Sequence, residues 1–343
     1  MEIIAIALAA LLLSFCATSL LARADAPLRA LDRPNERSLH VRPTPRTGGI
    51  AIGGTIAIGW LLLYTFNPVP DFFAAICIGA LAVMLVSLLD DLYRLSPLLR
   101  LAGHLAGAGI VLSVGLAPEQ LGYPGGSWAW QPTVAYMLVG LLIVWMINLY
   151  NFMDGMDGFA GGMTVIGFGT LSLLGWIDGA AGFAGASLVV AAAAGGFLVR
   201  NFPPARIFMG DSGSVTLGFL VAAFSLWGVA EGIFQLWVPM LVFSPFVVDA
   251  TITLIRRAAR GERLWMAHCS HYYQRLVRMG WGHRRTALAE YVLMMSCAVS
   301  VFIVAHARPM WQWAMLLFWA VVYSVIALMI HRLERSRSEA AHA

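Results

Sequence analysis

Residues 3–22 read IIAIALAALLLSFCATSLLA, an uninterrupted apolar run that is long enough to cross a bilayer as one helix. The run exceeds the apolar part of a signal peptide, and Glu2 stands before it where a signal peptide has basic residues. It is followed by four arginines, Arg23, Arg29, Arg33 and Arg37. We therefore predict a first transmembrane helix whose N-terminus lies outside the cell.

Ten further apolar stretches follow in the 343-residue chain, in which 60% of the residues are hydrophobic and 12% are charged. This composition is typical of a polytopic helical protein of the lipid bilayer. The sequence predicts an all-α integral membrane protein with about 11 transmembrane helices, N-out and C-in. After the first, the spans are predicted at about 48–66, 71–89, 99–116, 132–150, 158–176, 180–199, 213–230, 235–255, 286–306 and 310–331.

The charges divide unequally between the two sides of this predicted membrane. All 22 basic residues are arginines, and only Arg308 falls in an outward connection, which makes the inward side the cytoplasm. The arginines border the spans and suit anionic headgroups, so the net charge of +4 gives no reason to expect a nucleic-acid partner. The four cysteines lie in apolar spans or a cytoplasmic loop and predict no disulfide.

Six aspartates lie on or near the inward face, although a carboxylate at a membrane boundary is costly unless a cation or ligand partners it. They are Asp90, Asp91, Asp154, Asp157, Asp211 and Asp249. An acidic cluster inside a basic rim suggests an enzyme that binds a metal ion and a phosphorylated substrate. Residues 1–331 are predicted to form a single transmembrane catalytic domain, and 332–343 a short, disordered cytoplasmic tail.

The first of five inward loops combines arginines with helix-breaking residues. Residues 43–49 read PTPRTGG, a sequence that excludes a regular helix. Backbone amides here and the guanidiniums of Arg42 and Arg46, next to His40, are then free to bind phosphate oxygens.

The second loop begins with the adjacent carboxylates of Asp90 and Asp91, which repel each other and require a proton or a cation. Arg100 and His104, four residues apart on the next span, share a helix face and are expected to line the same cavity.

The third and fourth loops combine acids with glycines. Residues 148–158 read NLYNFMDGMDG, where the glycines break the helix and let the backbone approach a ligand near Asp154 and Asp157. In the segment 201–214, Asp211 precedes a span between two glycines. A carboxylate at a helix start with exposed amides beside it suits a Mg²⁺-bound diphosphate.

The fifth loop, 256–285, carries His268 and His271, which are three residues apart. They resemble half of a zinc site, but the sequence supplies no second half, so zinc is not expected. Asp249 lies two turns before Arg256, and a structural partnership with that arginine and a catalytic role are equally plausible.

Taken together and in this order, these segments resemble the polyprenyl-phosphate N-acetylhexosamine-1-phosphate transferase superfamily, of the glycosyltransferase family 4 type. The resemblance runs from about Asp32 to Leu288. Its most specific parts are Pro43-Thr44-Pro45-Arg46 with Gly48-Gly49, the Asp90-Asp91 pair, Asn148 to Gly158, and Phe208-Met209-Gly210-Asp211.

The resemblance implies transfer of a sugar 1-phosphate from a UDP-N-acetylhexosamine to undecaprenyl or another polyprenyl phosphate, with release of UMP. It implies Mg²⁺ as the cofactor, with Mn²⁺ as the alternative ion, and a multi-pass location in the bacterial inner membrane with the active site facing the cytoplasm. The product would start O-antigen or another envelope polysaccharide. A homodimer is left open.

By the same resemblance, Asp211 is the chief metal ligand, with Asp90 and Asp154 as further ligands. Asp90 and Asp91 would serve the lipid phosphate, with Asp90 deprotonating or orienting it. Asn151 and Asp154 would line the diphosphate. The uridine would be held by Gly155, Met156, Asp157, Asn201 and Phe208.

The fifth loop departs from the family pattern. The sugar-transferring branch usually carries H-x-H-H there, whereas Tyr273 and Gln274 stand at the later histidine positions. His271 alone keeps a matching position, His268 is a candidate substitute, and Arg275 is a candidate phosphate contact. The missing triple histidine argues against the muramoyl-pentapeptide branch and favours an O-antigen-initiating one, whose sugar would be a deoxy N-acetylhexosamine.

Two other classes of protein remain as alternatives. A secondary transporter also carries intramembrane acids, but it places them near the midplane, whereas five of these six acids sit at span ends. A non-catalytic scaffold for polysaccharide assembly would have no reason to keep costly carboxylates.

Overall fold

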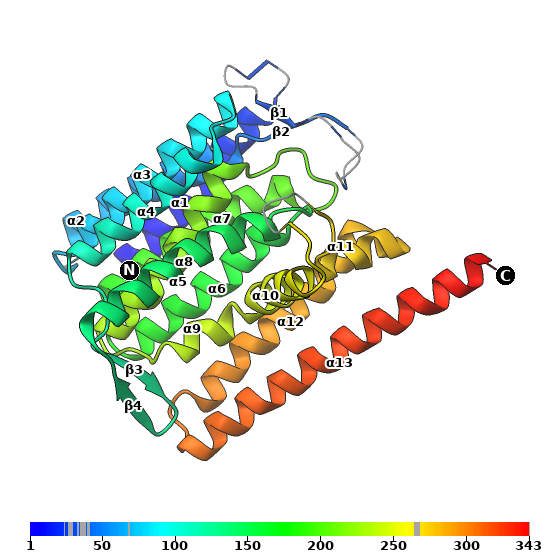
Figure 1. Cartoon of the computed structure of the whole chain (residues 1–343). Coiled ribbons are helices and arrows are strands. Elements are labelled where there is room, and N and C mark those ends of the chain that lie inside the picture. Colours follow the sequence, from blue (N-terminus) through cyan, green and yellow to red (C-terminus); the bar gives the residue numbers. More distant parts are fainter. Residues whose placement is uncertain are drawn as a thin grey trace.

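The computed structural model describes residues 1–23, 25–26, 30–32, 34, 39, 42–67, 69–263 and 268–342, with side chains up to 336. The chain is almost wholly helical (Figure 1). The helices are α1 (Glu2–Leu21), α2 (Gly48–Phe66), α3 (Phe73–Tyr93), α4 (Pro97–Ser113), α5 (Pro132–Met153), α6 (Phe159–Ile177), α7 (Ala181–Asn201), α8 (Asp211–Ala230), α9 (Trp237–Val242), α10 (Ser244–Ala259), α11 (Tyr272–Leu276), a π-helical turn η1 (Val277–Trp281), α12 (Gly282–Val304) and α13 (Pro309–His342). Two short antiparallel pairs complete it, β1 (Leu31–Asp32) with β2 (Thr44–Pro45) and β3 (Gln120–Tyr123) with β4 (Gly126–Ala129).

The predicted all-α membrane fold is confirmed. Within the described ranges, nine helical segments are long and apolar enough to cross a membrane, and α4 is a shorter apolar helix of 17 residues. Each predicted span overlaps one of these helices or the α9–α10 segment. The exact number of crossings and the N-out, C-in orientation stay predictions.

The predicted span 235–255 is not one helix. α9 ends at Val242, and α10 begins after Phe243 with Pro245 as its second residue. Proline lacks an N–H and is favoured in a first turn, so it starts a new helix where hydropathy alone shows a continuous run. In Figure 1, α10 is viewed nearly end-on while the long helices run across the picture, so α10 points out of their common direction.

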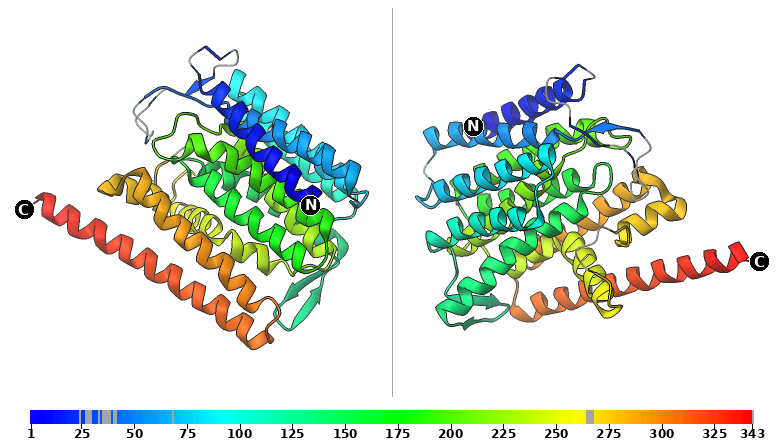
Figure 2. Two further views of the ribbon diagram at one scale, coloured as in Figure 1. Left: turned by 180° about the vertical axis from the view of Figure 1, so that it is seen from behind. Right: turned by 45° about the horizontal axis from the view of Figure 1, so that its top comes forward.

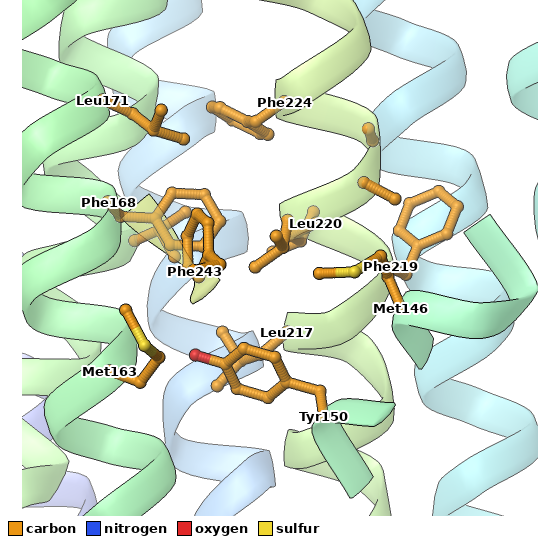
Figure 3. Close-up of a cluster of buried hydrophobic side chains, with 14 of the residues drawn as sticks. Met146, Tyr150, Met163, Phe168, Leu171, Leu217, Phe219, Leu220, Phe224 and Phe243 are labelled. Carbon is orange, nitrogen blue, oxygen red and sulfur yellow. The ribbon is translucent and has the colours of Figure 1, made fainter. Parts of the chain in front are cut away.

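Helix α8 is the axis of the bundle. Seventeen of its 20 residues are buried, and α3, α5, α2 and α7 pack around it. A helix that is apolar on all sides belongs in the interior. Figure 3 shows this core, in which Leu217, Leu220 and Phe224 of α8 face Tyr150 and Phe168. The burial of α8 brings its N-terminus to the centre of one end of the bundle.

The two ends of the bundle differ. The β1–β2 pair and the segments after α3, α5 and α7 gather at one end, whereas the β3–β4 hairpin lies at the other (Figure 1). The tail predicted to be disordered from residue 332 is instead helical as far as His342. Contacts hold this extension: Glu334 pairs with Arg275, and Ile330 packs against Tyr272 and Leu276.

The crossing of α2 and α8 depends on glycine. A Cβ on Gly49 would lie 2.2 Å from the backbone nitrogen of Gly213, whereas a Cβ on Gly54, farther along α2, would meet nothing within 4 Å. Gly49→Ala should therefore lower the free energy of unfolding by about 1–3 kcal/mol, the usual cost of overpacking. Thermal unfolding in detergent measures this, with Gly54→Ala as the matched control. Equal midpoints for the two variants would show that the crossing is not limited by backbone contact.

Candidate active site

The N-terminus of α8 is capped by a carboxylate from another helix. Asp91, at the end of α3, accepts hydrogen bonds from the N–H of Asp211 at 3.2 Å and of Ser212 at 2.9 Å. These are the amides that a helix cannot satisfy itself, and a negative charge there is favourable. Gly210 supplies the left-handed turn before the helix, with φ of 75°. Asp91 is thus buried at the centre of the site, with both carboxylate oxygens engaged.

The first and fourth loops form one unit around this cap. Phe208 donates its N–H to Pro45, and Gly48 and Gly49 donate theirs to Phe208 and Met209. Arg46 is placed by this pairing: its Nη2 donates to the backbone oxygen of Asp91 at 2.6 Å, and its Nη1 lies 3.7 Å from the Asp91 carboxylate. Arg46, predicted from the sequence to be free for phosphate oxygens, is thus engaged with Asp91.

Asp90 contacts α4 and also lies near Asp211 at the start of α8. Its carboxylate accepts the N–H of Leu95 at 2.7 Å and lies 3.3 Å from Nη1 of Arg100. Arg94, which directly follows α3 and precedes Leu95, adopts φ of 55°. This conformation turns the chain sharply at the end of α3. Of the predicted pair on α4, Arg100 contacts an acid of the site and His104 is buried.

Asp154 and Asp211 are the two acids of the site without a cationic partner. Within the described part of the chain, no arginine or histidine pairs with either carboxylate. Removal from water raises the pKa of Asp154 well above its usual range, and the negative charges of Asp211, Asp91 and Asp157 raise it further. Nearby, Asn151 donates to the hydroxyl of Ser214 at 3.2 Å, which ties the end of α5 to α8.

This pair has the donor chemistry of a magnesium site. Mg²⁺ binds through one or two carboxylates and completes its shell with water and substrate phosphate oxygens. Over the described residues, no three acidic, histidine or cysteine side chains are already grouped as metal ligands. The residues fit an ion held by Asp154 and Asp211 together with a bound phosphate, and Asp90 is already engaged with Arg100.

Asp157 connects the third loop to the fourth. One of its oxygens accepts the N–H of Ala205 at 2.9 Å, and the other lies 3.1 Å from Nδ1 of His283. Gly158 donates its N–H to the side-chain oxygen of Asn201, which in turn donates to Ile207. Asp157 and Asn201 thus support the loop backbone.

The remaining predicted uridine contacts, Gly155, Met156 and Phe208, lie on these same two loops. Gly155 is exposed, Met156 is buried and Phe208 is half-buried. A Cβ on Gly155 would fall 2.2 Å from the hydroxyl of Tyr273, so a side chain at this position would require Tyr273 to move.

Sequence reasoning missed His283 as a site residue. Its Nδ1 faces Asp157, and its Nε2 lies 3.2 Å from the backbone oxygen of Leu39. It therefore joins the start of α12 to the third loop and the first. The sequence feature that could have indicated His283 is its place directly after Gly282, at the start of a helix.

Asp249 is the anchor of the fifth loop. Its carboxylate accepts the N–H groups of Tyr272 at 2.9 Å and Tyr273 at 3.2 Å and the hydroxyl of Thr253 at 3.1 Å, and it lies 3.2 Å from Nδ1 of His271. Its partner is thus the fifth loop, and Arg256 instead contacts the hydroxyl of Tyr272. The buried carboxylate fixes the orientation of the His271 ring.

His268 lies beside His271, with ring centroids 4.9 Å apart. Burial lowers the pKa of His268 to about 4, and the nearby His271 and Arg257 lower it in the same direction. At neutral pH His268 is therefore uncharged, and its Nδ1 lies 2.8 Å from the hydroxyl of Ser270.

The other basic residues predicted to contact substrate lie in different settings. Arg275 pairs with Glu334 of α13, so its guanidinium serves the attachment of the last helix. Arg42 is exposed, and its backbone oxygen accepts the hydroxyl of Thr44. His40 lies outside the described residues.

The chain is similar to a family of membrane transferases. Residues 73–229 match the model of glycosyl transferase family 4. The chain is 31% identical to the probable undecaprenyl-phosphate N-acetylglucosaminyl 1-phosphate transferase of Bacillus subtilis, over 90% of this chain and 86% of the relative. It is 30% identical to the decaprenyl-phosphate N-acetylglucosaminephosphotransferase of Mycobacterium tuberculosis (88% and 83%). It is 26% identical to the undecaprenyl-phosphate alpha-N-acetylglucosaminyl 1-phosphate transferase of Escherichia coli K12 (88% and 84%).

The role of Asp249 can be tested without an activity assay. In Asp249→Asn, an NH2 group replaces one of the two acceptor oxygens and the negative charge is lost. The hydrogen bonds that this charged carboxylate accepts, worth about 1.5–3 kcal/mol each, are then weakened. The amides of residues 268–276 should then exchange with deuterium at least about tenfold faster, as measured by mass spectrometry. Asp178→Asn, at an exposed site at the end of α6, should leave this peptide unchanged. Unaltered exchange in Asp249→Asn would contradict the anchoring role.

Proposed function

Because the chain belongs to glycosyl transferase family 4, we propose that it transfers an N-acetylhexosamine 1-phosphate from a UDP-sugar to a polyprenyl phosphate. The oxygen of the lipid phosphate attacks the phosphorus that carries the sugar. The bond from that phosphorus to UMP breaks, and UMP leaves as the diphosphate-linked lipid forms. Relatives that are similar over nine tenths of the chain carry this reaction class in their names, which supports the proposal.

The observation that carries the proposal is the pair Asp154 and Asp211, which lies where α5 ends and α8 begins and lacks a cationic partner among the described residues. Donor and acceptor are both anions, so their reaction requires positive charge at the point of contact. Asp154 and Asp211 would hold Mg²⁺, which would supply the positive charge that the diphosphate and the UMP leaving group need. Secondary transport is a weaker explanation because the pair lies at a helix end that the first, third and fourth loops surround.

Asp90 is our candidate for the residue that orients or deprotonates the acceptor phosphate. The amide of Leu95 and the guanidinium of Arg100 hold its carboxylate in one orientation. Arg100 lies at the same point and can attract the incoming phosphate. Asp91 contributes indirectly, since its oxygens hold the start of α8 and so place Asp211.

The donor nucleotide would lie against the third and fourth loops. Gly155 on the third loop is exposed, and Phe208 on the fourth loop is half-buried. Asp157 and Asn201 hold these two loops together from beneath. Their contribution to uridine binding would then be the shape of the pocket.

We place this reaction at the cytoplasmic face of a bacterial inner membrane, where the product would start O-antigen or another envelope polysaccharide. UDP-N-acetylglucosamine is the first donor to test, since the similar enzymes are named for that sugar. The assay incubates the purified protein with undecaprenyl phosphate, Mg²⁺ and a panel of labelled UDP-N-acetylhexosamines. Formation of UMP and a diphosphate lipid supports the proposal, and their absence with every donor would refute it.

Asp211→Asn should reduce turnover in this assay at least about hundredfold, because a ligand to the charge-neutralising ion is lost. The variant should unfold at the same temperature as the wild type or a higher one, since the substitution removes one of several neighbouring like charges. Asp178→Asn, an equivalent change at an exposed position, should be fully active. A folded Asp211→Asn enzyme with near-normal turnover would exclude Asp211 as a ligand.

The two histidines of the fifth loop should differ in importance. The ring of His271 is oriented by Asp249, whereas burial lowers the pKa of His268 to about 4 and leaves that ring uncharged at neutral pH. His271→Ala should cost about 2–4 kcal/mol of transition-state stabilisation, a rate loss of about a hundredfold or more. His268→Ala should lose far less. Small, equal losses would show that neither imidazole contacts the reacting phosphates.

A further inference from the structure

A crevice of about 680 Å³ lies apart from the candidate active site, between the C-terminal ends of α1 and α7 and the segment that follows α7. It opens at the end of the bundle that carries the acidic cluster. Its lining includes three arginines and several apolar side chains, namely Arg23, Arg200, Arg206, Phe15, Cys16 and Leu20.

Arg200 is fixed in position in the wall of this crevice. Its Nε donates to the hydroxyl of Ser19 at 2.9 Å, and its guanidinium lies 5.1 Å from the ring centre of Phe15. These contacts leave its two terminal nitrogens without a hydrogen bond to any described residue. An Arg side chain held this way presents a planar pair of donors, which matches the oxygens of a phosphate.

The other two arginines add positive charge that is not neutralised within the crevice. Arg206 is exposed, and its side chain has no hydrogen bond or ion pair to the described part of the chain. Arg23 lies 3.9 Å from Asp25, and both side chains of this pair are exposed. Among the residues that the structure describes, no aspartate or glutamate lines the crevice. Its ligand should therefore be an anion.

The apolar side of the crevice indicates what kind of anion fits. α1 lies on the outside of the bundle against α7 (Figure 2, left). Leu20 and Cys16 on α1 are exposed, as expected for side chains that contact lipid tails. The arginines thus lie where the apolar surface ends, at the level of lipid headgroups.

We propose that this crevice binds the headgroup phosphate of an anionic membrane phospholipid, with Arg200 and Arg206 as its principal contacts. The acyl chains would lie along Leu20 and the outer face of α1. A free phosphate would use the arginines but gain nothing from this apolar surface, so the crevice fits a lipid better than a soluble anion.

The bound lipid would also stabilise the active-site loops, a consequence that rests on the proposed function. The N–H of Arg206 donates to the backbone oxygen of Arg200. The preceding residue, Ala205, donates its N–H to Asp157 of the third loop. A phosphate that bridges Arg200 and Arg206 therefore holds the segment that positions Asp157.

Lipid binding can be measured without any activity assay, by native mass spectrometry of the full chain with phosphatidylglycerol or phosphatidylcholine. Arg200→Gln/Arg206→Gln should weaken phosphatidylglycerol binding at least about tenfold and leave phosphatidylcholine unaffected. The matched control, Arg284→Gln/Arg285→Gln, removes two exposed arginines at the start of α12 and should behave as wild type. Should the double variant fail to fold, Arg206→Gln alone, which breaks no side-chain contact, should weaken binding about fivefold.

Two competitors distinguish the sources of the phosphate. Inorganic phosphate and undecaprenyl phosphate are each added to the complex with phosphatidylglycerol, and neither should displace the lipid held by the arginines. Displacement by inorganic phosphate would make this a soluble-anion site, and displacement by undecaprenyl phosphate would make it part of the acceptor site. Either result, or equal losses in both double variants, would overturn the proposal.

Transferase activity in vesicles tests the effect on the active-site loops. Wild type and the Arg284/Arg285 control should be at least twofold more active in mixed phosphatidylglycerol and phosphatidylcholine than in phosphatidylcholine alone, and Arg200→Gln/Arg206→Gln should not respond. If no variant transfers sugar in any vesicle, the proposed function fails while the binding result stands. If binding is lost and stimulation persists, the lipid does not act through this crevice.

Discussion

The structure depends on one interaction, the capping of a buried helix start by Asp91. Helix α8 runs through the middle of the bundle, so the amides of its first turn are shielded from water and require internal acceptors. The Asp91 carboxylate on α3 receives two of them. Arg46 on the first loop then reaches Asp91, and Gly48 and Gly49 bind the chain just before α8. Loss of this cap would leave buried donors unsatisfied at the meeting point of three segments.

The aspartates therefore divide into two groups with different tasks. Asp91 holds backbone, Asp90 is paired with a guanidinium, and Asp157 and Asp249 each accept backbone amides and face an imidazole. Asp154 and Asp211 have no cationic partner among the described residues. The acids with backbone or cationic partners hold the site in one shape, and the pair without a cationic partner keeps its negative charge available to a cation. This arrangement is what the chemistry of two anionic substrates requires.

The sequence predicts the class of fold well because the membrane penalises polar residues so strongly. Nearly every helix lies at its predicted apolar run, and five of the six costly aspartates, all but Asp249, lie close enough to influence one another's charge. What the sequence could not show is which acid is partnered, because the partners come from distant segments: His271 for Asp249 and His283 for Asp157. Arg275 illustrates the same difficulty, since its partner Glu334 lies in a tail with no apolar pattern. The break at Pro245 was missed because hydropathy is continuous across it.

The fifth loop shows how this chain accommodates its departure from the usual histidines. The hydroxyl of Tyr273 donates to the backbone oxygen of Phe152, and Gln274 accepts the N–H of His271. Both side chains thus tie the loop to itself and to the end of α5. The hydroxyl of Tyr273 also occupies the space that a Cβ at Gly155 would need. A tyrosine at position 273 therefore goes together with a glycine at position 155. Because anchoring groups replace the imidazoles at positions 273 and 274, a contact between a phosphate and an imidazole at these family positions must come from His271, and Asp249 sets the orientation of its ring.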